Sequence, residues 1–105
     1  MSIAVTLDEL VGTLEGYPWG YFVSVSDDGR AHLLAVPTHF QDGGLHLKAG
    51  RRGTANVAVR PEVSMVFPGV DGSAYSLIVD GTAEVADDAV VFRPASAVLH
   101  RPALD

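Results

Sequence analysis

Residues 45–65 read LHLKAGRRGTANVAVRPEVSM, and they contain three different sequence patterns in immediate succession. In residues 45–48 (LHLK) leucines alternate with polar side chains, which is the period of a half-buried strand. Thr54 is typical of a helix N-cap, and the helix that follows it, TANVAVR, must end before Pro61. The stretch therefore predicts a strand, a basic loop with the sequence AGRRG, and a short helix over residues 54–60.

Alternating or apolar segments bounded by turn residues lie on both sides of this stretch. Asp28-Gly29 and Asp42-Gly43 are strong tight-turn signals, and prolines at positions 37, 68 and 94 favour strand edges or bulges. Six strands are predicted in all, at residues 21–26, 30–40, 45–48, 63–67, 76–85 and 89–101. Short strands with turns at intervals of roughly 8–12 residues are typical of a sandwich or barrel.

A short helix is predicted ahead of the first of these strands. Thr6 and Glu9 have the capping-box spacing, in which each side chain satisfies the backbone N–H of the other residue. Leucine and valine then recur at helical intervals, and Gly16 suits the position after a helix end. The pattern predicts an amphipathic helix over residues 7–15.

Composition narrows the class of protein. The chain has 105 residues, of which 48% are hydrophobic, and this is enough for one domain over residues 1–105. A net charge of -6 argues against nucleic-acid and membrane partners, which need extended basic surface. Without cysteine there is no disulfide and no thiolate metal site. Because no signal-peptide pattern or membrane-length apolar run is present, we expect a soluble cytoplasmic protein.

Positive charge is concentrated around the glycine-rich loop. Lys48, Arg51 and Arg52 are three of only seven Lys and Arg residues in the chain. Helix N-termini favour anions, arginine can bind phosphate oxygens in pairs, and the Thr54 hydroxyl can donate a further hydrogen bond. The alternative is that these basic residues lie in a solvent-exposed turn, where their charge balances that of acidic neighbours. Since no phosphate-binding glycine motif is present, these residues alone do not decide between the two interpretations.

The order of several short motifs resembles the pyridoxamine 5'-phosphate oxidase-like flavin-binding split barrels. A strand–Asp-Gly–strand unit carries His32 early in its second strand, and the predicted helix with Asn56 leads into PEVS (residues 61–64). The segment YSLIVDGTAEV (residues 75–85) and the tail VVFRPASAVLHRPA complete the pattern. The resemblance covers residues 17–102.

This resemblance implies a mainly β fold, namely a six-stranded antiparallel split barrel with an N-terminal helix and a helix between the third and fourth strands. It also implies a homodimer with one FMN in each of two grooves at the interface. The implied function is transfer of a hydride or electrons to or from a small organic substrate. A deazaflavin coenzyme, or a non-catalytic module that holds a flavin or haem, are the alternatives.

Site residues follow from the resemblance position by position. Arg52 is assigned to the phosphate, the strand that contains Ala35 is assigned to the isoalloxazine ring, and the tail is assigned to the partner's groove. The expected cofactor-binding residues are His32, Leu34, Ala35, Val36, Lys48, Arg51, Arg52, Thr54, His100 and Arg101. No catalytic side chain and no metal ligand are assigned.

Two positions depart from the family pattern. Gly53 stands where pyridoxamine 5'-phosphate oxidases have a lysine, which argues against that exact activity, as does the short C-terminal segment. Ala35 stands where many deazaflavin-dependent relatives have a proline. The expected protein is therefore an FMN-dependent oxidoreductase that is not a true pyridoxamine 5'-phosphate oxidase.

Other side chains with chemical potential have ordinary explanations as well. His39 and His46 can donate protons near neutral pH, but they lie apart in the sequence without metal-ligand spacing, so a surface role is the commoner use. Trp19 and Tyr21 can stack on a ring, although core packing is the more frequent use of such residues.

Overall fold

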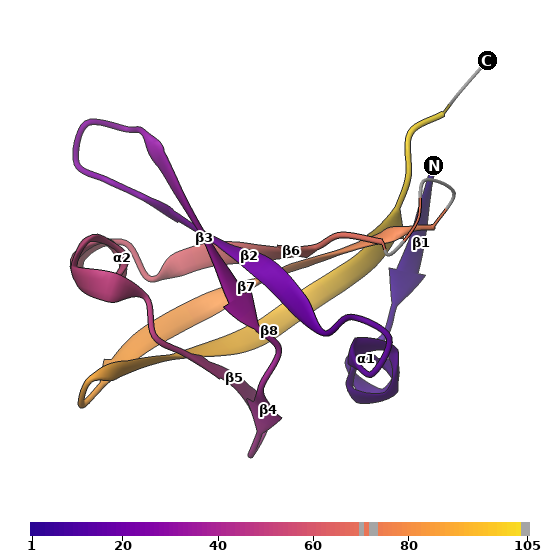
Figure 1. The fold of residues 1–105 in the computed structure, drawn as a ribbon, viewed down its shortest axis with the longest axis horizontal. Coiled ribbons are helices and arrows are strands. Elements are labelled where there is room, and N and C mark those ends of the chain that lie inside the picture. Colours follow the sequence, from indigo (N-terminus) through magenta and orange to yellow (C-terminus); the bar gives the residue numbers. More distant parts are fainter. Residues whose placement is uncertain (70, 72–73, 104–105) are drawn as a thin grey trace.

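The fold is a strongly curled antiparallel sheet with one helix at each end (Figure 1). The structure is a computed structural model that describes residues 1–69, 71 and 74–103. The strands are β1 (Ser2–Val5), β2 (Trp19–Val25), β3 (Ala31–Pro37), β4 (Phe40–Gln41), β5 (Gly44–Leu47), β6 (Glu62–Phe67), β7 (Ser76–Ala86) and β8 (Ala89–His100). The helices are α1 (Leu7–Leu14) and α2 (Gly50–Val59).

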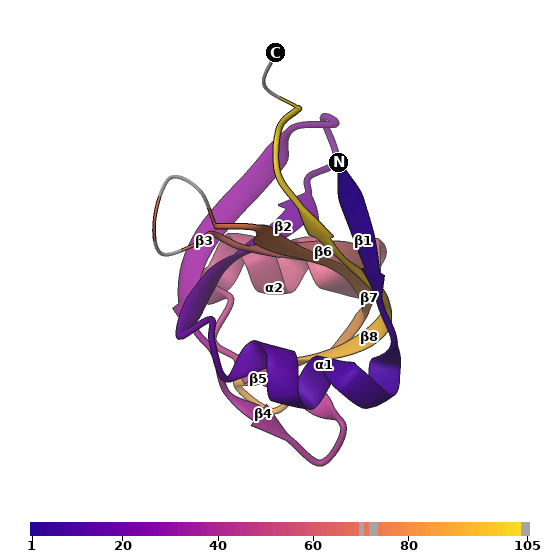
Figure 2. The ribbon, with the colours of Figure 1, turned by 90° about the vertical axis from the view of Figure 1, so that its right-hand side faces the viewer.

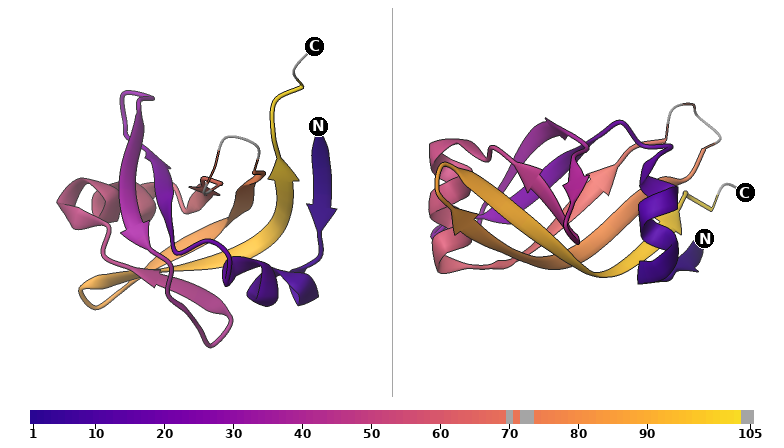
Figure 3. Two further views of the ribbon diagram at one scale, coloured as in Figure 1. Left: turned by 45° about the vertical axis from the view of Figure 1, so that its right-hand side comes forward. Right: turned by 90° about the horizontal axis from the view of Figure 1, so that it is seen from below.

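The two ends of the strand order, β3 and β4, lie at an open side of the curled sheet. Along the sheet the order is β3-β2-β6-β7-β8-β5-β4, and β1 pairs with the last part of β8. Because the sheet curls, it encloses a core that α1 and α2 close at opposite ends (Figure 2; Figure 3). This arrangement fits the split barrel that the resemblance implies.

The expected count of six strands is wrong for the described residues, which form an eight-stranded sheet. Each of the six expected segments contains a strand, but residues 30–40 divide into β3 and β4, and β1 was not expected. β4 has only two residues, too few to show an alternating pattern, and the four residues of β1, SIAV, do not alternate between apolar and polar side chains. They exist because a longer strand, β5 or β8, supplies their hydrogen-bond partners.

Pro37 and Pro94 lie at positions where strand pairing does not need a backbone N–H donor. Pro37 ends β3, which is an edge strand, and Pro94 lies at a register shift between β7 and β8 next to Asp80 and Gly81. A proline cannot donate a backbone hydrogen bond, so edges and bulges are the positions that tolerate it. These two predictions are confirmed.

The core is apolar and lies on the concave face of the sheet. Phe22, Phe67 and Phe92 are completely buried, and Leu10 and Leu14 of α1 pack against the same cluster. In the described residues no helix is long and apolar enough to cross a membrane.

The capping box of α1 is formed as the sequence predicts. The Thr6 hydroxyl accepts a hydrogen bond from the Glu9 backbone N–H at 3.2 Å, and Glu9 Oε1 accepts one from the Thr6 N–H at 3.0 Å. The Thr6 backbone N–H, together with the Thr6 hydroxyl that donates to Glu9 Oε1 at 2.9 Å, stabilises the charged carboxylate, so the pKa of Glu9 lies below its ordinary value. The helix covers Leu7–Leu14, within one residue of the predicted end.

We expect Thr6→Ala to lower the free energy of unfolding by about 1 kcal/mol, because an N-cap hydroxyl satisfies a backbone donor that alanine leaves without a partner. Urea unfolding followed by circular dichroism measures the change. Thr13→Ala is the control, since the Thr13 hydroxyl donates to the Glu9 carbonyl inside the helix and caps nothing. Equal midpoints for Thr6→Ala and the parent would refute this assignment.

The second helix begins earlier than predicted. It starts at Gly50, after Ala49 in the N-cap position, so Thr54 lies inside α2 and the prediction that it caps the helix is wrong. The AGRRG stretch is consequently the helix start and not a loop. Gly50 adopts a φ of 70°, which glycine accommodates without steric cost where the chain turns from β5 into the helix.

Candidate functional site

The open side of the barrel contains a pocket, here called the seam pocket. Its volume is about 530 Å³, and it lies between β3 at one end of the sheet and β5 near the other. Its wall is apolar along β3 and carries polar side chains on the opposite side. The lining residues are Leu34, Ala35, Val36, Pro37, His39, His46, Leu47, Lys48 and Ala89.

A second pocket, the hairpin pocket, lies where the β2–β3 turn faces the start of α2. Its volume is about 740 Å³. The lining residues are Ser26, Asp27, Asp28, Arg30, Ala31, His32, Arg52 and Asn56. Because both pockets are lined by β3, with Ala31 and His32 in one and Leu34–Pro37 in the other, that strand connects them.

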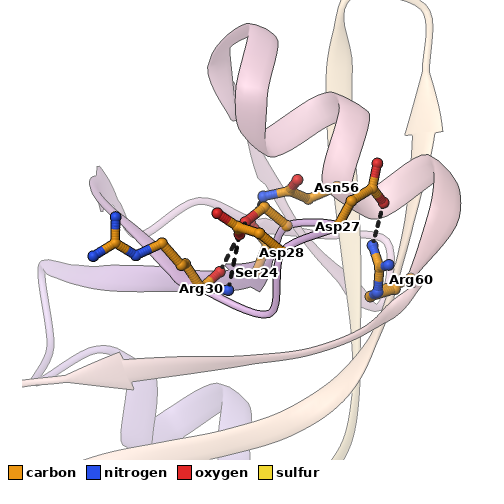
Figure 4. A network of polar contacts seen from close by, with 7 residues as sticks. Ser24, Asp27, Asp28, Arg30, Asn56 and Arg60 are labelled. Atoms are coloured by element: carbon orange, nitrogen blue, oxygen red, sulfur yellow. Dashed lines mark hydrogen bonds and ion pairs between the residues drawn. The ribbon is translucent and has the colours of Figure 1, made fainter.

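Polar contacts hold α2 against the β2–β3 hairpin. Asn56 Nδ2 donates to Ser24 Oγ at 3.0 Å, and both side chains are buried (Figure 4). At the end of the helix, the Arg60 guanidinium forms an ion pair with Asp27 at 2.9 Å. A buried donor such as the Asn56 amide is costly to leave without a partner, so the Ser24 bond fixes the position of the helix above the pocket.

The two acidic residues of the hairpin pocket already have partners. Asp27 pairs with Arg60, and the Asp28 carboxylate accepts bonds from the Ser26 hydroxyl and the Arg30 backbone N–H. The Ser26 bond, supported by the Arg30 N–H and by the positive charge of Arg52, holds the pKa of Asp28 below its ordinary value. Asp28 therefore remains a carboxylate at neutral pH.

The arginines of this pocket are available for an anion. Within the described residues, neither Arg30 nor Arg52 forms an ion pair through its guanidinium. Figure 4 shows the Arg30 side chain extending away from the Asp27–Arg60 pair. An exposed guanidinium presents several N–H donors in a planar fork that matches phosphate or carboxylate oxygens.

His32 carries the most informative atom of the site. Its Nδ1 is buried and has no hydrogen-bond partner in the described part of the chain. Gly53 of α2 is its neighbour, because a Cβ at that position would lie 4.0 Å from His32 Nδ1. A buried polar atom without a partner is rare in native proteins and indicates a place for a ligand or a bound water.

The expected site residues divide between the two pockets. Arg52 and His32 line the hairpin pocket, whereas Lys48 lines the seam pocket with the expected ring-contact residues Leu34, Ala35 and Val36. Lys48 also forms an exposed ion pair with Asp88 at 3.6 Å. The cations of the basic stretch are thus not gathered around one point.

Four expected residues line neither pocket. Arg51 is exposed in the first turn of α2, and Thr54 is half-buried inside the same helix. His100 lies at the end of β8, where its Nδ1 shares a hydrogen bond with Ser2 Oγ at 3.0 Å. The Arg101 guanidinium lies 4.6 Å from the ring centre of Tyr75. Within one chain, His100 and Arg101 are therefore engaged at the barrel end formed by β1, away from α2 (Figure 1).

Sequence reasoning missed the pairing of His39 with His46. Their rings lie 5.9 Å apart at one wall of the seam pocket. Asp42 and Gly43 have φ values of 52° and 78°, which is typical of a two-residue type I′ turn. Such a turn pairs Gln41 with Gly44 and Phe40 with Leu45, so the next pair is His39 with His46. The Asp-Gly turn signal in the sequence could therefore have predicted that His39 pairs with His46.

No family model matches the chain, but two mycobacterial proteins resemble it along most of its length. These are uncharacterized protein Mb0449c of Mycobacterium bovis and uncharacterized protein MT0457 of Mycobacterium tuberculosis. Each is 37% identical to the chain, over 94% of this chain and 82% of its own length.

Solved structures with the same fold have lower sequence identity. A Clostridium acetobutylicum protein of the pyridoxinephosphate oxidase family, related to general stress protein 26 of B. subtilis, has a TM-score of 0.69 at 15% identity over 90% of this chain and 87% of its own. An FAD binding protein of Mycobacterium smegmatis has a TM-score of 0.66 at 19% identity, over 96% and 100% of the two chains. An F420 reductase has a TM-score of 0.66 at 19% identity, over 81% and 93%.

Proposed function

The chain belongs to one family with the two mycobacterial proteins, within the pyridoxamine 5'-phosphate oxidase-like split barrels, and from this premise we propose that it is an FMN-dependent oxidoreductase. The phosphate of FMN binds in the hairpin pocket, and the isoalloxazine ring binds in the seam pocket. The observation that carries this proposal is the buried Nδ1 of His32, which has no partner in the described residues and lines the same pocket as Arg52.

Four features of the hairpin pocket suit a phosphate group. Arg52 and Arg30 supply charge-assisted donors, and the start of α2 supplies backbone N–H groups that have no partner inside the helix. The helix dipole adds a favourable potential for an anion at this end. Since Gly53 has no side chain, the ligand can approach the helix backbone and His32 closely.

The seam pocket suits a flat ring with polar edges. Among the described strands β3 is an edge strand, so a row of its backbone N–H and C=O groups has no strand partner there and can bond the ring's heteroatoms. Leu34, Val36 and Leu47 supply apolar contact. His32 and Val36 are separated by about 13 Å along an extended strand, a spacing that suits a ligand with an anion at one end and a ring at the other.

FMN, when bound, would supply the hydride and electron transfer itself. The chain's residues would orient it: the hairpin pocket fixes the anion, the edge of β3 fixes the ring, and the apolar wall excludes water from one ring face. We assign no nucleophile. The Ser26 hydroxyl in the hairpin pocket donates to the Asp28 carboxylate, but the lowered pKa of Asp28 makes that carboxylate a weak base, and the described lining of the seam pocket includes no hydroxyl or thiol side chain.

The convex face of the sheet supports the homodimer that belongs to this proposal. An apolar row, here called the outer row, crosses five strands through the paired residues Ala35, Tyr21, Val66, Ile78 and Val98. Leu33 and Trp19 lie beside it and are 56% and 42% exposed. Ala35 also lines the seam pocket, so a second copy seated on the outer row would border that pocket.

The absorption spectrum of the purified protein after loading with FMN tests cofactor binding, and anaerobic reduction tests turnover. We expect saturable FMN binding, reduction by a nicotinamide donor and reoxidation by an organic acceptor. Binding without any redox cycle would indicate a carrier or sensor instead of an enzyme. Absence of binding would refute the proposal.

A deazaflavin coenzyme is the second candidate, because one of the similar folds is that of an F420 reductase. Both coenzymes combine a flat ring with a phosphate-bearing chain, so both pockets suit either. Parallel titrations with FMN and with the deazaflavin distinguish them. Tighter binding of the deazaflavin, with reduction of the acceptor only in its presence, would assign the protein to the deazaflavin-dependent reductases.

A further inference from the structure

His39 and His46 form a paired wall on the side of the seam pocket opposite β3. They are cross-strand neighbours at the base of the β4–β5 hairpin, where the His46 backbone N–H donates to the His39 carbonyl at 2.9 Å. Directly opposite residues in an antiparallel pair project their side chains to the same face. Their rings consequently lie 5.9 Å apart, and both line the pocket.

Gln41 determines which ring nitrogens remain free. His46 Nε2 lies 3.1 Å from the Gln41 backbone carbonyl, which only accepts, so Nε2 carries the proton. His39 Nε2 lies 3.0 Å from Gln41 Oε1, which also accepts. Both rings are therefore oriented through Nε2, and neither Nδ1 has a hydrogen-bond partner among the described residues.

A cation completes this side of the pocket. The Lys48 ammonium contacts Asp88 at 3.6 Å, with both side chains more than 80% exposed, at 82% and 84%. An exposed ion pair of this kind is weak and exchanges readily for another partner. The seam pocket thus combines the apolar wall formed by Leu34 and Val36 with three nitrogen groups on the other side.

We propose that His39, His46 and Lys48 form a substrate subsite that binds the carboxylate of a flat organic acid next to the flavin ring. When Nδ1 is protonated in addition to Nε2, the imidazolium donates to a carboxylate oxygen through Nδ1. Lys48 adds a mobile charge, and the apolar wall contacts the flat body of the molecule. The inference rests on the proposed function, because the bound flavin ring forms the remaining wall of this subsite.

Binding of benzoate to the FMN-loaded protein, measured by isothermal titration calorimetry, tests the subsite. Benzamide is the matched ligand, since it has nearly the same shape without the negative charge. We expect the parent to bind benzoate at least tenfold more tightly than benzamide. In the double variant His39→Gln/His46→Gln this preference falls to about threefold or less, and Lys48→Gln gives an intermediate value.

Arg93→Gln serves as the control variant, because Arg93 is an exposed cation of β8 that pairs with Glu84 and lines neither pocket. It should keep the full preference for benzoate. FMN affinity is measured separately for every variant by flavin fluorescence. Normal FMN binding with an unchanged benzoate preference in the double variant, or with no benzoate preference in the parent, overturns the subsite alone. Failure of the parent to bind FMN overturns both proposals.

Discussion

Replacement of Arg52 by alanine is expected to weaken FMN binding by about 1.5–3 kcal/mol, roughly 10- to 150-fold in Kd, without altering the fold. This is the contribution of a hydrogen bond in which a charged group takes part. Arg52 lines the hairpin pocket and has no ion-pair partner within the described residues. Its guanidinium can therefore form an ion pair with a bound phosphate without giving up another one. Titration of the apoprotein with FMN, followed by fluorescence quenching, measures the change.

Arg51→Ala is the matched comparison for this experiment. It removes the same charge from the adjacent position of α2. Both arginines are exposed, but Arg52 lines the hairpin pocket, whereas Arg51 lines neither pocket. We expect its FMN affinity to change by less than about threefold, the size of a screened long-range effect. Equal losses in the two variants would mean that only the general positive charge of the helix start matters. The specific assignment of the phosphate to the hairpin pocket would then be wrong.

Leu33→Glu is expected to convert a dimer into a monomer, with the dimer Kd raised by at least about 100-fold. In a two-fold interface each substitution occurs twice, and each copy buries a carboxylate without a partner at a cost of several kcal/mol. Leu33 is 56% exposed in the single chain, so the variant itself should fold normally. Light scattering after size-exclusion chromatography, over a range of protein concentrations, measures the association.

Val59→Glu tests whether any exposed apolar residue has the same effect. Val59 is 62% exposed at the end of α2 and does not belong to the outer row. This variant should remain a dimer. A parent protein that is monomeric at every concentration would contradict the interface proposal. A monomeric Leu33→Glu variant that binds FMN as tightly as the parent would show that one chain completes the cofactor site.

The sequence predicted best those elements whose signals are local. The capping box of Thr6 and Glu9 is formed, the helix after it ends within one residue of the prediction, and the longest strands begin and end close to their predicted limits. In each case the residues that make the signal also make the contact, as with a side chain that caps its own helix. Such patterns do not depend on what packs against them.

The start of α2 was misplaced because two glycines and two arginines in AGRRG read as a loop. Glycine has a low helix propensity, but tertiary packing can outweigh that preference. At Gly53 a Cβ would lie 2.9 Å from the Cβ of Ala49, the N-cap of the same helix, so glycine avoids a collision in the first turns of α2. The residue that argued against a helix in the sequence therefore fits the start of this helix without a clash.

By itself the sequence determined the class of fold, the positions of six of the eight strands that the described residues form, and the concentration of positive charge between β5 and β6. Only the tertiary structure decided which of these residues meet. Curling of the sheet brings β3 beside β5, so that Leu34 and Leu47 line one pocket, and it places Lys48 and Arg52 in different pockets. The physical reason is that periodicity specifies which face of a strand is buried, whereas proximity between strands depends on the register and curvature of the whole sheet.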